Sequence, residues 1–362
     1  MSAKEIKSLT GIRGLAAVYV IVFHWFVEIS HLHLTSINSY FKKFLGHGYL
    51  AVDLFFVLSG FVLCLSSYNL FQQFNFNNYK SFMFKRFVRI FPLYICITLL
   101  FFFLYNDKLS KLLVNVTLFQ GLTFKYNNSI IPPGWSLTNE WIIYFLFPFL
   151  FYFILRMVKK PWMLILSSLF ILILLSSVRS YDFNWSNYSF LRKVEGIHPV
   201  ISLSRGPASL LRTLADYILG VFVFLMYQRG TQVEYFKYLI VVLFVALCFS
   251  KTDILIIMLI PFIIIHLTKS NIASDWLSHK SIYFIGLISY SLYVNHYLFI
   301  KTYKQASNLL GVNHSLFSFC YVIIGTIIMS IITYYAIEKP AINLFRRIKT
   351  KETVVVQQFP SI

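Results

Sequence analysis

The sequence predicts an all-α fold, a polytopic transmembrane helix bundle of about ten spans. Hydrophobic residues make up 58% of the 362 residues and charged residues only 12%, about half of the charged share that is usual in soluble domains. Apolar stretches long enough to cross a bilayer, about 20 residues each, recur along the chain. They cover residues 11–30, 49–68, 89–105, 140–158, 162–178, 213–228, 236–250, 253–268, 282–302 and 315–337.

The count of ten depends on two short neighbouring stretches. Residues 236–250 and 253–268 are closely joined, so one of them could be re-entrant. With ten spans both termini lie on one side, and a small majority of the 32 Lys and Arg residues falls on that side, most clearly in the short loops. By the positive-inside rule, we expect a cytoplasmic N-terminus, a membrane domain over residues 1–345 and a short cytoplasmic tail over residues 346–362.

The net charge of +19 does not indicate nucleic-acid binding. The basic residues are spread over loops on both faces and do not form the single stripe that nucleic acid needs, whereas anionic lipid head groups of the surrounding membrane explain some of them. We also expect no metal site. The four cysteines fall within apolar stretches without metal-ligand spacing, which is typical of core residues.

The first apolar stretch carries two ionisable residues, Arg13 and His24. Such side chains are rare inside a span and normally face the bundle interior or a water-filled cavity, so both are candidate functional residues. They are eleven residues apart, almost three helical turns, and therefore share one helix face about 16 Å apart along the axis. This face presents a cation near the membrane edge and a titratable imidazole deep inside the bilayer.

The second and third stretches add a carboxylate and a pair of arginines. Asp53, in GYLAVDLFFVLSGFVL, lies near the outer end of its span, at a depth similar to that of His24. It would either fix the tautomer and charge of that imidazole or merely cap its helix. Arg86 and Arg89, in KRFVRIFPLY, share a face at the cytoplasmic edge. Paired guanidiniums suit phosphate, although positive-inside anchoring is the simpler explanation.

The fourth stretch opens from the outside with PPGWSLTNEW. Glu140 lies at the mouth of this span, where a carboxylate could act as a base, bind a substrate hydroxyl or balance an Arg or His. Trp135 is typical of the aromatic belt at a membrane interface. Ser136 would be a nucleophile only beside a base, and a helix cap is the simpler interpretation.

Two further sets of polar residues lie in later spans. His296, in GLISYSLYVNHYLF, falls in the outer half of the ninth span, at a depth similar to that of His24, although a lone buried histidine is more often structural. Arg212 and Asp216 are four residues apart and are expected to form an intrahelical pair.

Together these segments resemble acyltransferase family 3, whose multi-pass membrane enzymes modify bacterial surface glycans and some small molecules. The resemblance covers nearly the whole chain and is specific because its motifs keep their order and spacing. It rests on Arg13 and His24 with ten residues between them, VDLFFVLSGF, RFVRIFPLY with Arg86 and Arg89, WSLTNEW with Glu140, SYSLYVNH, and EKP at 338–340.

The resemblance implies an acyltransferase domain in a bacterial inner membrane, with acetyl-CoA or a related acyl-CoA as donor. The acceptor would be a hydroxyl of a glycan or lipid-linked glycan on the far side. Arg13, Arg86 and Arg89 would hold the CoA phosphates, Trp135 and Ser136 would bind the acceptor, and His24 would carry the chemistry with Asp53, Glu140 and His296 orienting it or relaying protons. The donor would enter from the cytoplasm near Arg89 and the acceptor from outside near Glu140.

Several alternatives stay open from the sequence. His24 could deprotonate the acceptor hydroxyl for direct attack, or it could carry the acyl group briefly itself. A lipid-linked glycan transporter would also need many spans and buried charges. An enzyme of the same family that acts on a small molecule or a lipid would share every motif.

Overall fold

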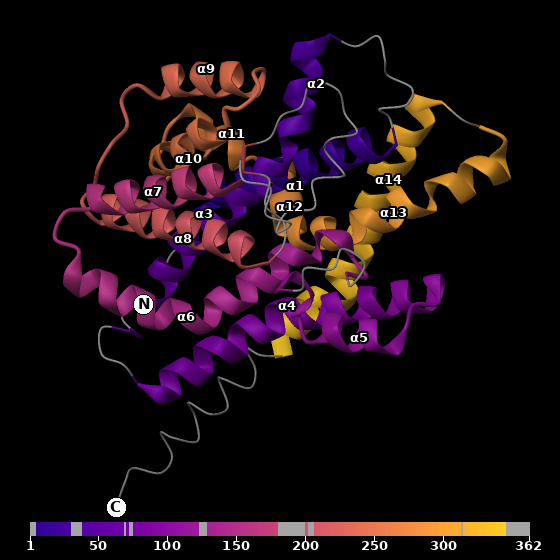
Figure 1. Ribbon diagram of the computed structural model, residues 1–362, viewed down its shortest axis with the longest axis horizontal. Helices are drawn as coiled ribbons and strands as arrows, with labels where there is room; N and C mark the ends of the chain where they lie inside the picture. The colour runs from indigo at the N-terminus through magenta and orange to yellow at the C-terminus, as the bar shows by residue number, and fades with distance from the viewer. Residues whose placement is uncertain are drawn as a thin grey trace, which may run out of the picture.

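The computed structural model of the protein describes residues 5–29, 38–68, 70–71, 75–122, 129–179, 200–201, 206–312 and 314–344. Within these ranges every regular element is a helix, in agreement with the predicted all-α class (Figure 1). The α-helices are α1 Lys7–Glu28, α2 Ser39–Gly46, α3 Ala51–Ser67, α4 Phe76–Tyr105, α5 Leu109–Val116, α6 Trp135–Met157, α7 Trp162–Arg179, α8 Gly206–Gln228, α9 Phe236–Leu247, α10 Asp253–Leu267, α11 Ile272–Leu277, α12 Lys280–Leu287, α13 Ser289–Leu310 and α14 Ser315–Thr333. A π-helical turn, Tyr334–Glu338, extends α14. The tail predicted over residues 346–362 lies outside the described residues.

Six helical stretches in the described part of the chain are long and apolar enough to cross a membrane. They are Lys7–Glu28, Ser39–Ser67, Phe76–Tyr105, Pro132–Met157, Gly206–Gln228 and Ser315–Leu344, and they match six of the predicted spans. Trp162–Ser177, Phe236–Leu247 and Asp253–Leu267 are apolar but shorter. A polytopic helical bundle is therefore confirmed, whereas the count of ten spans is not.

The ninth predicted span is two helices instead of one. α12 ends and α13 begins at Ile288, whose φ of −90° and ψ of 7° interrupt the helix. α13 is 22 residues long, but it carries polar side chains that are completely buried, among them Asn295 and His296. Protein and not lipid surrounds this face, and α13 is therefore not among the six long apolar stretches, although the sequence predicts a span over residues 282–302.

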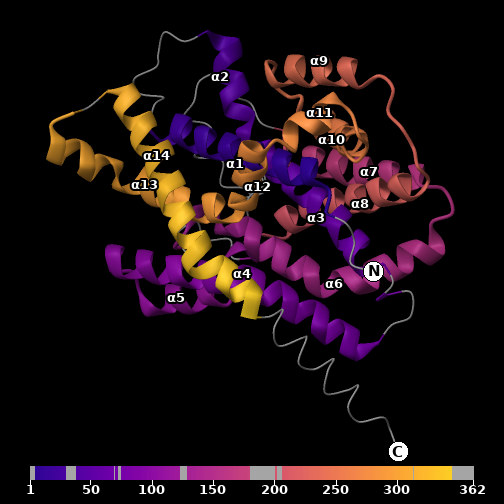
Figure 2. The same ribbon diagram turned by 180° about the vertical axis from the view of Figure 1, so that it is seen from behind.

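α1 lies between two groups of helices. Figures 1 and 2 show α3, α7 and α8 on one side of α1 and α13 and α14 on the other, with α4 and α6 below them in both views. α1 packs directly against α3, α12 and α13, and α4 packs against α6 and α13. The helices that carry the predicted site residues are thus neighbours, although they are far apart along the chain.

Glycines allow two of these packings to be very close. A Cβ placed on Gly14 of α1 would lie 2.6 Å from the backbone nitrogen of Gly286 in α12. A Cβ on Gly220 of α8 would lie 2.5 Å from the Val57 carbonyl oxygen of α3, and one on Gly60 would lie 2.8 Å from the carbonyl oxygen of Tyr217. Small residues at such crossings let helix backbones approach within a membrane.

Candidate active site

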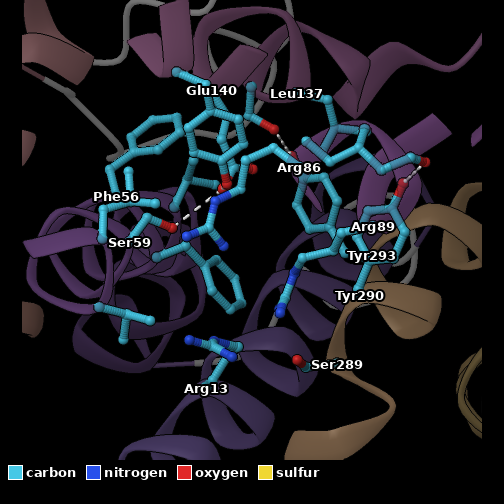
Figure 3. A pocket seen from close by; sticks show the side chains of 17 residues that line it. Arg13, Phe56, Ser59, Arg86, Arg89, Leu137, Glu140, Ser289, Tyr290 and Tyr293 are labelled. Atoms are coloured by element: carbon cyan, nitrogen blue, oxygen red, sulfur yellow. Dashed lines mark hydrogen bonds between the residues drawn. The ribbon is translucent and has the colours of Figure 1, made fainter. Parts of the chain in front are cut away.

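The pocket that contains the predicted arginines is formed by α1, α3, α4, α6 and α13. It encloses about 860 Å³, including its open mouth. Its polar lining consists of Arg13, Ser59, Arg86, Arg89, Ser136, Glu140, Tyr144, Ser289, Tyr290 and Tyr293. Figure 3 shows the three guanidinium groups directed toward the same central space. We call this space the arginine pocket.

Arg86 is fixed by the protein, yet one of its nitrogens has no hydrogen-bond partner in the described part of the chain. The residue is only 6% exposed, its Nη2 donates to Ser66 Oγ at 3.2 Å, and its guanidinium lies 5.1 Å from the ring centre of Phe82. Its Nε is buried without a hydrogen-bond partner among the residues that the structure describes. Leaving such a donor unpaired is costly, so a ligand oxygen in the arginine pocket would complete the site.

The helix that carries Arg86 and Arg89 begins well before the third predicted span. α4 begins at Phe76, where the side chain of Asn75 caps it by accepting from the backbone nitrogen of Asn77, and not at Arg89. At 1.5 Å per residue Arg86 therefore lies about 15 Å inside its helix. Glu140 of α6 lines the same pocket. Arg89 and Glu140 are therefore neighbours in the structure, which favours access to both from one side of the membrane over the access from two sides that the sequence suggests.

Glu140 is the carboxylate of the arginine pocket, and two hydroxyls hold it. The Tyr144 hydroxyl, one helical turn further along α6, donates to Oε1 of Glu140. Ser59 Oγ of α3 donates to the same oxygen at 3.2 Å. The carboxylate is therefore fixed across α3 and α6, beside the three guanidiniums, where it can balance part of their charge.

Ser136 and Trp135, predicted to bind the acceptor, occupy different positions. Ser136 is buried in the wall of the arginine pocket, where its Oγ lies 2.7 Å from the hydroxyl of Tyr293. That hydroxyl donates to the Pro133 carbonyl at 2.9 Å. Trp135 packs edge-on against Phe56, with ring centres 6.3 Å apart.

His24 and His296 form a directly contacting pair beyond Tyr293. Nδ1 of His24 lies 3.2 Å from Nε2 of His296 and 3.0 Å from the Val20 carbonyl oxygen. Nδ1 of His296 lies 2.7 Å from the Tyr293 carbonyl oxygen and must donate to it, since a carbonyl only accepts. Nδ1 of His24 in turn carries the hydrogen that faces the Val20 carbonyl oxygen and Nε2 of His296, so Nε2 of His24 carries the lone pair of a base.

Asp53 does not pair with His24 as one interpretation of the sequence had it. Its carboxylate accepts from Arg212 of α8, through Nε at 2.8 Å and through Nη2, and both residues are fully buried. The prediction that Arg212 pairs with Asp216 within its helix is wrong for the same reason. The fork of a guanidinium matches a carboxylate best when both of its arms are used, and Asp53 offers that geometry across α3 and α8.

Five polar residues of the pocket were not predicted from the sequence, namely Ser59, Tyr144, Ser289, Tyr290 and Tyr293. Tyr144 follows Glu140 by four residues, a spacing that places the two side chains together on a helix, and so could have been found. Ser59 and Tyr293 lie within the motifs VDLFFVLSGF and SYSLYVNH, but their partners belong to distant parts of the chain. Only the packing of α3, α6 and α13 brings them to the pocket.

Comparison with known proteins shows the family to which the chain belongs. Among curated proteins and among solved structures, none matches the chain. A family model described as an acyltransferase domain matches residues 6–335, which include every residue of the arginine pocket and both histidines. Nearly the whole chain is covered, and the protein therefore belongs to acyltransferase family 3.

Proposed function

We propose that this membrane acyltransferase transfers an acetyl group from acetyl-CoA to a hydroxyl of a bacterial cell-surface glycan, such as O-antigen, exopolysaccharide or capsule. The observation that carries the proposal is that three arginines from two helices line one pocket, while the same helix α1 brings His24 to a second histidine. Acetyl is the acyl group we favour because it is frequent in this family.

The arginine pocket suits the phosphate end of a CoA thioester. Guanidiniums offer planar forks of donors that match phosphate oxygens, and the buried Nε of Arg86 is an additional donor without a partner among the described residues. With a cytoplasmic N-terminus in the inner membrane, this pocket lies toward the side where CoA is made. Arg13 and His24 share one face of α1 about 16 Å apart, a distance that the flexible arm of CoA would bridge.

The histidine pair suits the chemical step. Nε2 of His24 would take the proton of the acceptor hydroxyl while that oxygen forms a bond to the thioester carbonyl carbon. The carbon–sulfur bond then breaks, and the imidazolium of His24 returns its proton to the departing CoA thiolate. The Val20 carbonyl and His296 both contact Nδ1 of His24, which would leave Nε2 in the form of a base.

Mass spectrometry of surface glycans tests the proposal. A strain that lacks the protein should lose one acetyl mass from a surface glycan, and the wild-type gene should restore it. His24→Ala should not restore it although the protein reaches the membrane at normal levels, because an essential base usually contributes about 10²-fold or more. His279→Ala is a matched control, since His279 is exposed at the start of α12. Full acetylation by His24→Ala, or an unchanged glycan in the deletion strain, would contradict the proposal.

A further inference from the structure

Polar residues continue along the helices past the histidine pair, on the side away from the arginine pocket. Glu28, the last residue of α1, follows His24 by four residues, and the two share a helix face with Arg13. On α13, Tyr293, Tyr297 and Lys301 recur at intervals of four and share a face in the same way. Because α1 packs against α13, the two faces run side by side from the arginines to the other ends of the helices.

At those ends the side chains form a cluster of charges and aromatic rings. The Tyr297 hydroxyl donates to Oε1 of Glu28 at 2.9 Å. The ammonium of Lys301 lies 4.7 Å from the ring centre of Tyr105, 5.9 Å from Phe101 and 6.0 Å from Tyr297. We call Glu28, Phe101, Tyr105, Tyr297 and Lys301 the outer cluster.

The outer cluster adjoins the histidines directly. The ring centre of Tyr297 lies 6.0 Å from that of His24, in a perpendicular arrangement, and 6.2 Å from that of His296. Lys301 is exposed, whereas Glu28 is half-buried. A molecule that contacts these two groups would therefore lie beside Tyr297, whose ring adjoins both histidines, on the side away from the arginine pocket.

The chemistry of the outer cluster fits a sugar ring. A carboxylate and an ammonium together can accept from and donate to neighbouring hydroxyls. Phe101 and Tyr297 are buried, whereas Tyr105 is half-buried and is the ring of the cluster that can pack against the apolar C–H face of a pyranose. Asp107 and Lys111, whose charges act on Lys301, pair with each other at 2.8 Å. An acyl chain would favour a surface without charges.

We propose that the outer cluster is the acceptor subsite and that Glu28 and Lys301 determine which sugar presents its hydroxyl to His24. This inference rests on the proposed function, since it names the residues that receive the glycan. It also assigns the acceptor to a region other than Ser136, which lies in the wall of the arginine pocket. Donor and acceptor would then approach the histidine pair from opposite ends of the same helices.

Steady-state kinetics of the full-length enzyme in lipid nanodiscs separates the two substrates. The acceptor probe is the glycan fraction purified from a strain that lacks the protein, and the donor is acetyl-CoA. Glu28→Gln and Lys301→Met should each raise the KM for the glycan about tenfold or more, the loss expected for a hydrogen bond to a charged group. The KM for acetyl-CoA should stay within about twofold. Lys304→Met, which alters another exposed lysine of α13, is the control and should change neither value.

The outcomes distinguish the two proposals. If the wild type acetylates the glycan and both variants keep its KM, the outer cluster is not the acceptor subsite, while the proposed function stands. If the variants lose both acetyl-CoA binding and acetyl transfer, the two residues only support the fold, and this result would also overturn the inference. If the wild type transfers acetyl to no component of the fraction, the glycan acceptor itself is wrong, and the inference falls with it.

Discussion

Asp53 and Arg212 place opposite charges where both side chains are fully buried. The cost of removing two ions from water is offset only by good geometry, and the two-armed contact between them provides it. Asp216, one turn along α8 from Arg212, is also fully buried, and neither of its carboxylate oxygens has a hydrogen-bond partner among the described residues.

We predict that Asp53→Asn destabilises the protein by about 3 kcal/mol, because breaking one side of a buried pair leaves an uncompensated charge. Thermal unfolding in detergent would measure this. The double variant Asp53→Leu, Arg212→Met should recover most of the loss, since it removes both charges. If the double variant transfers as much acetyl per folded molecule as the wild type, the role of Asp53 is to stabilise the fold. An inactive but stable double variant would support the catalytic role predicted from the sequence.

Arg86 and Arg89 should matter for the donor alone. Replacing both by Ala is expected to weaken acetyl-CoA binding at least about tenfold, because two guanidinium–phosphate contacts are lost. Lys at both positions should restore only part of the affinity, since an ammonium lacks the planar fork. Isothermal titration with the purified enzyme measures this, with Arg229→Ala as a control at the C-terminal end of α8. If the double Ala variant binds acetyl-CoA with unchanged affinity, the role of both arginines is to anchor the helix at the membrane edge.

Residues on one helix were easier to predict than residues joined across helices. The helical period alone placed Arg13 and His24 on one face, and both line or adjoin the site in the structure. The partner of Asp53 is 159 residues away in sequence, and no local spacing indicates it. The same is true of the contact between His24 and His296, which are 272 residues apart.

At the scale of elements, the close crossing of α3 and α8 supports the arginine pocket. α3 supplies Ser59 to the pocket wall, while its opposite side packs against α8 through Gly60 and Gly220. A side chain at either glycine would meet backbone atoms, which cannot move aside as a flexible side chain can. The two helices would then have to separate.

We expect Gly220→Ala to lower the midpoint of thermal unfolding and Gly220→Leu to prevent recovery of folded enzyme, because even a Cβ would lie 2.5 Å from the Val57 carbonyl oxygen. Overpacking of this kind typically costs about 1–3 kcal/mol or more. Leu211→Ala, at an exposed position of α8, should change the midpoint little. Wild-type stability of Gly220→Leu in a fluorescence melting assay would be incompatible with the crossing.

Element boundaries were less predictable than element existence. Hydropathy placed the start of the third span at Arg89, because the preceding residues are polar and basic, but the helix begins at Phe76 with the Asn75 cap. α13 was merged with α12 into one span because an apolar run continues across Ile288. In both cases the hydropathy of a residue does not tell whether lipid, water or another helix surrounds it.

For the whole molecule, the shared pocket determines from which side of the membrane a reagent can reach Arg89 and Glu140. After the four native cysteines are replaced, Arg89→Cys and Glu140→Cys should react with a membrane-impermeant thiol reagent from the same side, because both positions line the arginine pocket. The expected side is the cytoplasm. A Lys160→Cys marker, in a short exposed loop, should react from that side too. A Lys108→Cys marker before α5 should react from outside. Reaction of the Arg89 and Glu140 positions from opposite sides would contradict this pocket.

The distance between the arginines and His24 also selects donors by their length. Arg13 and His24 lie about 16 Å apart along one helix. A donor whose phosphates bind to the arginines can therefore react at His24 only if the group between its phosphates and its acyl carbon spans this distance. Acetyl phosphate, whose acyl group is attached to the phosphate itself, would occupy the arginines with its reactive carbon far from the imidazole. The enzyme should therefore discriminate among activated acetyl compounds by their length, even when their reactivity is equal.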